Sequence, residues 1–395
     1  MDKLFIKDID ARGKKVLVRV DFNVPFDDQG NISDDARIRA AMSTINYLLD
    51  ENASIILASH LGRPKGKVVP EMSLGPVAKR LSRLLDKDVI FIADCIGGNA
   101  KKIISEMKAG EVALLENLRF HAGEEANDPE FAKEFFDLGD LFVQEAFGNC
   151  HRSHASMVGF KSDIHKAAAG FLIKKEMDYF EKAIKKPMRP VVAILGGAKV
   201  SDKVLVIENL AKSVDKLLIG GAMAFTFLKA LGYDVGASLV EDSMLDTALK
   251  IVGKLKEDNV KLYLPVDFVV AERFDPKAES KIVPFQEIPS KWMALDIGPA
   301  TTKLFRETLE DAKTILWNGP MGAFEMDAFS RGTYAMVDAL VNSHSLTIVG
   351  GGDTDLAFHN AGESYKVSFI STGGGAFLKL LEGEVLPGIE ALSDA

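Results

Sequence analysis

Short apolar runs recur along the chain, and longer segments with helical spacing separate them. Runs of four or five apolar, often β-branched residues are typical of buried strands. In the first half we predict strands at Val16–Val20, Ser54–Ala58, Val89–Ala93, Val112–Leu115 and Leu141–Val143. In the second half we predict them at Val191–Leu195, Lys216–Ile219, Lys261–Leu264, Thr314–Trp317, Leu346–Val349 and Lys366–Ile370.

The intervening segments have the periodicity of amphipathic helices. One apolar face comprises Leu74, Val77, Ala78, Leu81, Leu84 and Leu85, and Ser73 precedes it as the expected N-cap. Strands that alternate with helices are typical of a parallel sheet covered by helices on both faces. The pattern runs through five or six strands and then begins again. We therefore predict an α/β fold of two doubly wound domains with parallel sheets.

The break between the halves lies near residues 170–190. A helical stripe there comprises Ile173, Met177, Phe180 and Ile184, and Pro187 follows it. We expect an N-terminal domain at 1–170, a joining hinge helix at 171–187 and a C-terminal domain at 188–380. The tail, 381–395, is too short for another strand–helix unit, and we expect it to pack back on the N-terminal domain.

Composition supports this division and excludes some partners. A chain of 395 residues is too long for one typical core. Its net charge is −9, whereas binders of nucleic acid or membrane surfaces are usually basic, so we expect neither as a partner. No apolar run approaches the ~20 residues that span a bilayer, and the first residues lack a signal-peptide core. Two cysteines make no disulfide framework, so we expect a cytoplasmic protein.

Polar and basic side chains follow the first-half strands, and the carboxyl ends of such strands bind ligands in open α/β sheets. These residues are Asp21 and Asn23, then His60 and Arg63, then Arg119, then His151, Arg152 and His154. Arg37 lies at the start of a helix, and Arg39 cannot share its face. Because guanidinium groups bind phosphate or carboxylate with two hydrogen bonds, we expect an anion site. Turn formation by Asp21 and Asn23, and structural roles for His151 and His154, remain alternatives.

The second-half strands end in glycine-rich segments instead. These segments are Gly196–Lys203, Gly220–Met223, Asn318–Glu325, Gly350–Thr354 and Ser371–Gly375. Glycine lets backbone amides approach a ligand, and a helix N-terminus favours phosphate. Lys203 can reach phosphates, and Asp353 with Thr354 suits a Mg²⁺ that a nucleotide carries. One glycine pair would indicate only a turn, but five such strand ends favour a nucleotide site.

Several familiar motifs are missing from the sequence. It has no G-x-x-x-x-G-K-[ST], no G-x-G-x-x-G after a strand and no H-E-x-x-H or paired C-x-x-C. These absences argue against a P-loop NTPase, a dinucleotide dehydrogenase and a structural zinc site. Cys150 beside His151 is better interpreted as a small packing residue than as a nucleophile.

Taken together, the motifs resemble the phosphoglycerate kinase family over essentially the whole chain. The matching segments are Arg19–Pro25, Arg37-Ile38, His60–Gly66, Leu115–Asp128, Ala146–Ser156, Gly196–Lys203, Gly220–Lys229, Trp317–Glu325, Gly350–Thr354 and Ser371–Ala376. The resemblance implies two Rossmann-like domains, a monomer and glycolytic phosphoryl transfer from 1,3-bisphosphoglycerate to Mg-ADP, which gives 3-phosphoglycerate and ATP. It also implies hinge-bending closure of the domains.

The resemblance also implies site residues. For the phosphoglycerate these are Asp21, Phe22, Asn23, Arg37, His60, Leu61, Gly62, Arg63, Arg119 and Arg152. For the nucleotide they are Gly197, Ala198, Lys199, Lys203, Gly221, Asn318, Pro320, Glu325, Gly351, Gly352, Asp353 and Thr354. Arg37, Lys203 and the amides of Gly373, Gly374 and Gly375 would be catalytic at the transferring phosphoryl group, and Asp353 would hold Mg²⁺.

Some positions depart from the family pattern, and two rival functions stay open. The departures are Gln144-Glu145, Ala294, Ala300 and Phe377, which leave the adenine side and closure undetermined. A different carboxylate kinase and a non-enzymatic two-domain protein that binds a phosphorylated ligand are the alternatives, because fold alone does not decide function.

Overall fold

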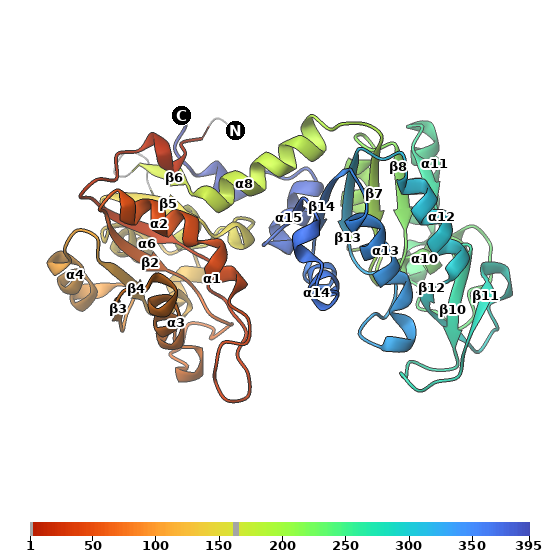
Figure 1. The fold of residues 1–395 in the computed structure, drawn as a ribbon, viewed down its shortest axis with the longest axis horizontal. Helices are drawn as coiled ribbons and strands as arrows, with labels where there is room; N and C mark the ends of the chain where they lie inside the picture. Colours follow the sequence, from red (N-terminus) through yellow and green to blue (C-terminus); the bar gives the residue numbers. More distant parts are fainter. Residues whose placement is uncertain (1–2, 161–165) are drawn as a thin grey trace. The chain divides into compact units, whose positions relative to one another are not determined.

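A computed structural model describes residues 3–160 and 166–395 of the chain. The chain forms two compact units, one of Met1–Asp178 with Val385–Ala395 and the other of Tyr179–Glu384. Each unit is built on a parallel six-stranded sheet (Figure 1). This architecture confirms the predicted α/β fold class.

The sheet of the first unit has the strand order β3-β4-β2-β1-β5-β6, and every pairing in it is parallel. Its strands are β1 (Lys15–Arg19), β2 (Ser54–Ala58), β3 (Val89–Ile92), β4 (Val112–Leu115), β5 (Leu141–Gln144) and β6 (Ala167–Ala169). Its helices are α1 (Ala36–Ala40), α2 (Met42–Asp50), α3 (Gly75–Leu85), α4 (Gly97–Glu106), α5 (Ala122–Glu125), α6 (Pro129–Phe136), α7 (Ala155–Val158) and, from the tail, α16 (Pro387–Glu390).

The sheet of the second unit has the order β15-β14-β13-β7-β8-β9 and is also parallel. Its strands are β7 (Val191–Leu195), β8 (Lys216–Ile219), β9 (Lys261–Tyr263), β13 (Thr314–Asn318), β14 (Leu346–Gly350) and β15 (Phe369–Ile370). Its helices are α9 (Val204–Leu210), α10 (Met223–Ala230), α11 (Leu245–Glu257), α12 (Pro299–Leu309), α13 (Arg331–Val341), α14 (Gly352–Asn360) and α15 (Gly374–Leu381).

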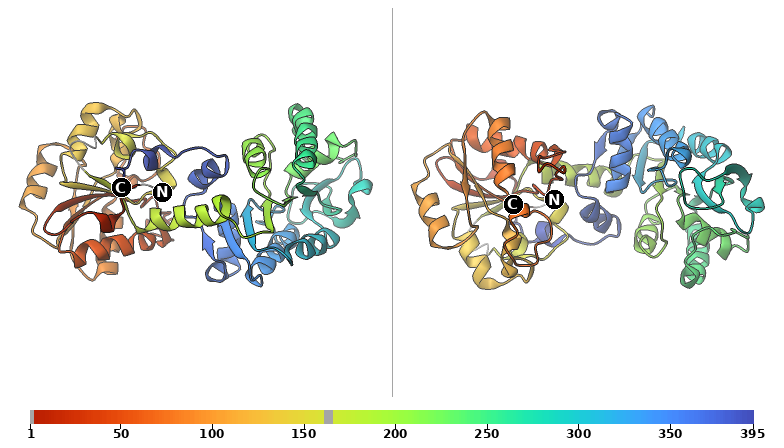
Figure 2. Two further views of the ribbon diagram at one scale, coloured as in Figure 1. Left: turned by 90° about the horizontal axis from the view of Figure 1, so that it is seen from above. Right: turned by 90° about the horizontal axis from the view of Figure 1, so that it is seen from below.

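Helices cover both faces of each six-stranded sheet (Figure 2). The central strands are therefore buried on both sides, and their sequences are continuous apolar runs rather than alternating ones. Val16 and Val18 of β1 and Ile55 of β2 belong to the core of the first unit. Ile194 of β7 and Trp317 of β13 belong to the core of the second. Because the strands are parallel, their carboxyl ends lie along one edge of each sheet, and packing on both faces holds that edge in place.

A third sheet is a feature that the sequence analysis did not predict. It is antiparallel, with the order β11-β10-β12, and consists of β10 (Asp267–Ala271), β11 (Ser280–Pro284) and β12 (Met293–Ile297). One face packs Phe268 and Val270 against Phe225 and Leu228 of α10. β11 is mostly exposed and carries little apolar signal, whereas β10 and β12 contain apolar residues that the sequence analysis did not assign to strands.

Several predicted boundaries also need correction. Strand β6 was not predicted, because three alanines carry no β-branched signal. The last strand is much shorter than predicted, since Ser364–Lys366 forms a 3-10 turn before β15. Ser73 is not the N-cap of α3, because Leu74 occupies that position and its amide donates to Oε1 of Glu116 at 2.8 Å.

The segment predicted to join the domains is helical. It consists of α8 (Phe171–Phe180) followed by one π-helical turn at Glu181–Lys185. The boundary between the two units falls inside α8, after Asp178. The chain therefore passes from one unit to the other through continuous helical backbone.

The C-terminal tail, from Val385 onward, belongs to the first unit. The amide of Gly388 donates to the carbonyl of Cys150 at 2.9 Å, and that of Ser393 donates to Ala167 at 3.0 Å. Lys3 and Asp394 form an isolated bridge, so the two ends of the chain lie side by side (Figure 1).

Across the described residues, none of the helices combines the length and the apolar character that crossing a bilayer requires.

The buried tail generates a prediction about stability. Leu392 is only 2% exposed, so Leu392→Ala should lower the free energy of unfolding of the first unit by about 2–5 kcal/mol. Chemical denaturation measures this change. Glu390→Ala, at an exposed position of the same tail, is the matched control and should be nearly neutral. Equal effects of the two changes would contradict a structural role for the tail.

Candidate functional site

The loops after β1 and β2 are joined by side-chain hydrogen bonds. Oδ1 of Asn23 accepts from the amide of Gly62 at 2.9 Å, and the amide of Phe22 donates to Oγ of Ser59 at 2.8 Å. Gly62 has a φ of +63°, which a residue with a side chain rarely adopts. The amide of Asn23 also donates to Oδ1 of Asp21 at 3.3 Å, so Asp21 stabilises the local backbone while Asn23 joins the loops of two strands.

A buried amide positions the loop after β4. Asn117 donates through Nδ2 to the carbonyls of Leu61 and Met72, and its Oδ1 accepts from the amides of Leu61 and Arg119. Arg119 is 4% exposed and donates through Nη1 to the carbonyl of Gly62 at 2.8 Å. Asn117 therefore fixes Arg119 against the loop that carries His60 and Leu61.

The two neighbouring arginines of α1 have different partners, as their helical spacing predicts. Arg37 donates through Nη1 to the carbonyl of Asn23 at 2.6 Å and lies 3.8 Å from Oδ2 of Asp21. Arg39 pairs with Asp35 at 2.8 Å. Arg37 therefore belongs to the cluster at the strand ends, and Arg39 belongs to a separate ion pair.

Arg19 is a functional candidate that the sequence analysis passed over. It is 1% exposed and donates to Oγ of Ser156 at 2.9 Å and to Oδ1 of Asn149 at 3.0 Å, and its Nη2 lies 3.3 Å from Nδ1 of His60. The sequence analysis places it inside the predicted strand Val16–Val20 and assigns it no contact with a substrate. Its charge at a buried strand end was the available signal.

His60 lies in the field of several guanidinium groups. Burial, reinforced by the charges of Arg19, Arg119, Arg152 and Arg37, holds its pKa well below the ordinary value of 6.5. The imidazole is therefore neutral at physiological pH. Nε of Arg152 is buried and has no hydrogen-bond partner among the described residues. A neutral histidine and an unsatisfied donor among arginines form a site that favours an anion.

His154 and Glu124 lie next to the arginine cluster. Burial, followed by the arginine charges, lowers the pKa of His154 to about 4. The fully buried carboxylate of Glu124 accepts from the amide and from Oγ of Ser156 at 2.9 and 2.6 Å. Arg63, in contrast, is exposed.

In the second unit, Lys203 ends the loop between β7 and α9, and Asn318 is the last residue of the neighbouring strand β13. Nζ of Lys203 donates to Oδ1 of Asn318, whose Nδ2 donates to the carbonyl of Gly350 at 2.7 Å. Lys203 is 8% exposed, and burial lowers its pKa to about 8. The ammonium group is thus held close to the carboxyl ends of β13 and β14.

Two helix N-termini meet beside this pair. Gly351, with a φ of +100°, precedes α14, and Oγ1 of the buried Thr354 accepts from the amide of Gly319 at 2.8 Å. A Cβ on Gly374, at the start of α15, would lie 3.1 Å from Cα of Gly351. The absence of side chains permits this close approach, which brings the N-termini of α14 and α15 and their helix dipoles together.

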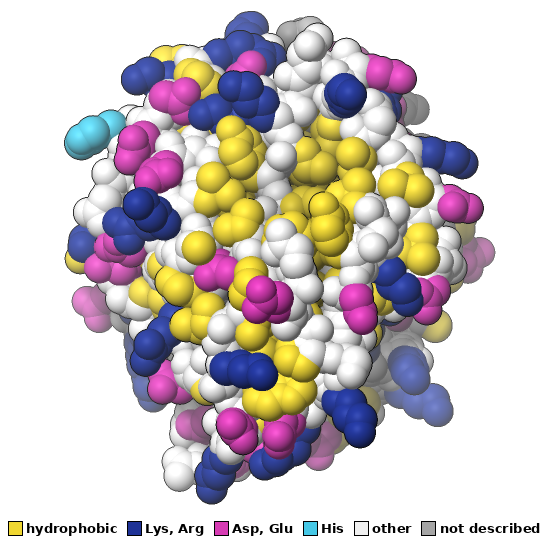
Figure 3. Space-filling model, turned by 90° about the vertical axis from the view of Figure 1, so that its right-hand side faces the viewer, with side chains coloured by type: hydrophobic (Ala, Val, Ile, Leu, Met, Phe, Trp, Pro, Cys, Tyr) yellow, Lys and Arg dark blue, Asp and Glu magenta, His cyan; other side chains and the backbone are white. Residues whose placement is uncertain are grey.

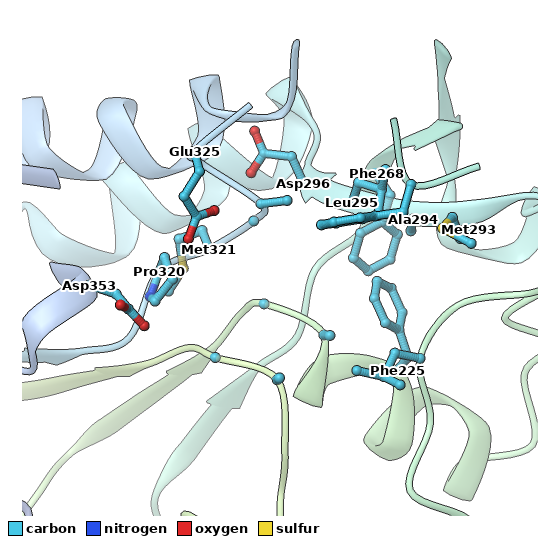
Figure 4. Close-up of a pocket in the computed structure, with 18 of the residues that line it drawn as sticks. Phe225, Phe268, Met293, Ala294, Leu295, Asp296, Pro320, Met321, Glu325 and Asp353 are labelled. Atoms are coloured by element: carbon cyan, nitrogen blue, oxygen red, sulfur yellow. The ribbon is translucent and has the colours of Figure 1, made fainter. Parts of the chain in front are cut away.

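A pocket of about 490 Å³ opens next to these helix ends (Figure 4). Of the predicted nucleotide residues, it is lined by Gly197, Ala198, Gly221, Pro320, Glu325 and Asp353. The lining does not include Lys199, Lys203, Asn318, Gly351, Gly352 or Thr354. Figure 4 shows Asp353 and Glu325 toward one end of the pocket and Phe225 and Phe268 toward the other.

The apolar end of the pocket was not predicted. It includes Leu239, Phe225, Phe268, Met293 and Leu295, most of which come from α10 or the antiparallel sheet. Figure 3 shows hydrophobic side chains gathered in the middle of one face, with charged groups around them. The apolar end of the pocket, called the apolar slot below, suits a flat aromatic group. Because the antiparallel sheet was missed, so was the slot.

The departures from the family pattern have defined places. Glu145 is buried, which raises its pKa to about 8, and it accepts from Oγ1 of Thr44 and the amide of Leu172. Ala294 lines the pocket, and the amide of Ala300 donates to Asp267. Phe377 packs so closely on Gly350 that any Cβ there would clash.

Comparisons with known proteins agree with this geometry. The family model of phosphoglycerate kinase matches residues 6–384. The chain belongs to the phosphoglycerate kinase family. It is 62% identical to a phosphoglycerate kinase of Citrifermentans bemidjiense over 382 residues, which is 97% of this chain and 96% of the relative. A phosphoglycerate kinase of Geotalea uraniireducens is 61% identical over 98% and 96% of the two chains.

Solved structures give the same result. The phosphoglycerate kinase structure from Coxiella burnetii superimposes with a TM-score of 0.90 at 40% identity and covers 98% of both chains. The resemblance predicted from the motifs is thus confirmed, as is the prediction of a kinase. A different carboxylate kinase and a non-enzymatic binding protein are not favoured.

The neutral His60 generates a prediction about pH. In the unfolded chain it takes up a proton near pH 6.5, whereas in the folded chain it remains neutral to a much lower pH. The free energy of unfolding of the first unit should therefore fall as the pH drops below about 6.5. Denaturation at a series of pH values should give a shallower slope for His60→Gln. The exposed His344→Gln is the control, and identical slopes for all three proteins would refute the assignment.

Proposed function

We propose that this chain catalyses reversible phosphoryl transfer from 1,3-bisphosphoglycerate to Mg-ADP, which gives 3-phosphoglycerate and ATP in glycolysis. One observation carries the proposal. This member of the family has an arginine cluster in its first unit and a pocket bordered by glycine-rich strand ends in its second. The first suits a phosphorylated carboxylic acid and the second suits a nucleotide.

In the first unit, the arginine cluster would hold the acid substrate. Arg63, Arg119, Arg152 and His60 would bind the 3-phosphate, while Asp21 and Asn23 would contact the hydroxyl and carboxyl region. The unsatisfied Nε of Arg152 supports this assignment, because a phosphate oxygen would complete its hydrogen bonding. Arg19 would act through His60, whose ring it contacts, as a positioning residue.

In the second unit, the pocket would hold the nucleotide. The apolar slot with Phe225 and Phe268 would take the base, and Gly197 of the pocket lining and the adjacent start of α14 at Gly351–Thr354 would face the phosphates. The exposed Asp353 carboxylate lines the phosphate end and suits Mg²⁺, which prefers oxygen ligands and few protein carboxylates. The ion would neutralise phosphate charge.

The chemistry needs no general base, because the accepting carboxylate is already ionised at neutral pH. Catalysis then rests on positioning and on stabilising the charge of a loose phosphoryl transition state. Arg37, Lys203 and the amides of Gly373–Gly375 would supply that stabilisation. A lysine whose pKa is lowered to about 8 still carries its charge in most molecules at neutral pH.

The reaction also requires a conformational step. Reacting atoms must approach to about 3–3.5 Å, and an acyl phosphate must be kept from water. We propose that hinge bending at the α8 segment brings the substrates together, and that the enzyme works as a cytoplasmic monomer.

A coupled assay of ATP formation from 1,3-bisphosphoglycerate and Mg-ADP tests the function directly. Turnover with these substrates is the expected result. Phosphorylation of acetate or aspartate in place of 3-phosphoglycerate would establish a different carboxylate kinase and overturn the proposal.

Arg37 generates a prediction about the chemical step. Arg37→Ala should lower kcat by about 10²–10³-fold with a modest change in the KM for 3-phosphoglycerate, because its charge acts on the transferring group. Steady-state kinetics measure both constants. Arg39→Ala is the matched control on the same helix and should keep nearly normal activity, since Arg39 pairs with Asp35. An unchanged kcat for Arg37→Ala would show that Arg37 does not stabilise the transition state.

Asp353 generates a prediction about nucleotide binding. Asp353→Ala should weaken the affinity for Mg-ADP but not that for 3-phosphoglycerate, because it would remove an oxygen ligand of Mg²⁺. Calorimetric titration with each ligand measures the change. Asp355→Ala removes an equal charge two residues along α14 and serves as the control. Unaltered Mg-ADP affinity in Asp353→Ala would place the metal elsewhere.

A further inference from the structure

Three side chains of different metal-binding types meet in the first unit, outside the residues assigned to either substrate. Asp94, Cys95 and His121 each offer one ligand atom, and these atoms lie within 4.8 Å of one another. We propose that they form a binding site for a soft divalent cation of the zinc class. This proposal is independent of the proposed function.

The fold brings the three residues together from two adjacent strands. β3 and β4 are parallel neighbours, so the segments that follow them leave the same edge of the sheet (Figure 1). Asp94 and Cys95 follow β3, and His121 follows the 3-10 turn Leu118–Phe120 after β4. Strand pairing therefore places the segments that carry the three residues beside one another.

Hydrogen bonds and packing already orient the ligands. Oδ1 of Asp94 lies 2.7 Å from Nε2 of His121 and accepts from the amide of Cys95 at 2.7 Å. The imidazole packs against the ring of Phe131, with centroids 5.6 Å apart. A cation would replace the Asp94–His121 hydrogen bond, and small side-chain rotations would bring all three donors into its coordination shell.

The donor set selects the type of metal. Thiolate, imidazole and carboxylate are the ligands of zinc, and three protein ligands with one open position are a common arrangement. A thiolate and a carboxylate together balance the charge of a divalent ion. Mg²⁺ prefers oxygen donors, so this site differs in selectivity from the one proposed at Asp353.

Burial and exposure are compatible with entry of an ion from solvent. Cys95 is 1% exposed, whereas the side chains of Asp94 and His121 are 48% and 33% exposed. Burial, with the charges of Asp94 and Glu124, raises the pKa of the Cys95 thiol, so the free thiol is protonated. Binding would form a metal–sulfur bond and release the thiol proton to solvent, and no oxidant or reductant is needed.

Cadmium titration of the intact, reduced protein tests the site, because a cadmium–thiolate bond has a charge-transfer band in the ultraviolet. We expect a band that saturates at one ion per chain, is removed by excess Zn²⁺ and persists in excess Mg²⁺. We also expect cadmium to raise the melting temperature of the first unit, since a ligand that binds the folded state stabilises it.

Variants distinguish a metal site with three ligands from cadmium binding by a single reactive thiol. Cys95→Ser should abolish the band, whereas Cys150→Ala, at the other buried cysteine, should retain it. His121→Gln and Asp94→Asn should each weaken the cadmium affinity by about tenfold or more. Circular dichroism establishes that each variant is folded. Absence of the band in the unaltered protein, its survival in Cys95→Ser, or unchanged affinity in both ligand variants would overturn the proposal.

Discussion

Repulsion among guanidinium groups is the constraint on which the first unit depends. Arg19, Arg37, Arg119 and Arg152 all lie close enough to His60 to lower its pKa, and two of them are almost completely buried. Such a concentration of charge is unfavourable unless partners offset it. The carbonyls of Gly62 and Asn23 and the side-chain oxygen Oδ1 of Asn149 accept from the arginines. Burial lowers the pKa of Arg19, and the nearby Glu124 partly offsets this effect. The excess positive charge that remains favours an anion.

The second unit also offers groups that favour an anion, but most of these groups are neutral. The helices α14 and α15 begin beside one another after the strand ends, and the buried Lys203 lies near them. Backbone dipoles carry no net charge, so several can be gathered without mutual repulsion. Close contacts such as that between Gly374 and Gly351 allow this. The two units therefore favour anions by different means, which suits two substrates of different chemistry.

Among the departures from the family pattern, Glu145 and Phe377 pack against backbone, whereas Ala294 lines the pocket of the second unit. Glu145 contacts the backbone of α8 at Leu172, within the segment that connects the units, and burial raises its pKa to about 8. Phe377 packs on Gly350 at the end of β14. These two side chains therefore contact the backbone of elements that carry the site or connect the units.

Local pattern was sufficient to predict the parallel strands and the kinds of residue at their ends, because strand periodicity and glycine-rich turns are encoded by neighbours in the chain. It placed β2, β4, β7 and β8 at their observed bounds. It missed β10 to β12, the apolar slot and the part played by Arg19, since each depends on contacts between residues far apart in sequence. The helical period separated Arg37 from Arg39, the family motif assigned Arg37 to the site, and the structure places Arg37 beside Asn23 and Asp21 and Arg39 beside Asp35. Burial and long-range hydrogen bonds are properties of the folded chain, and they determine which of many plausible side chains share a site.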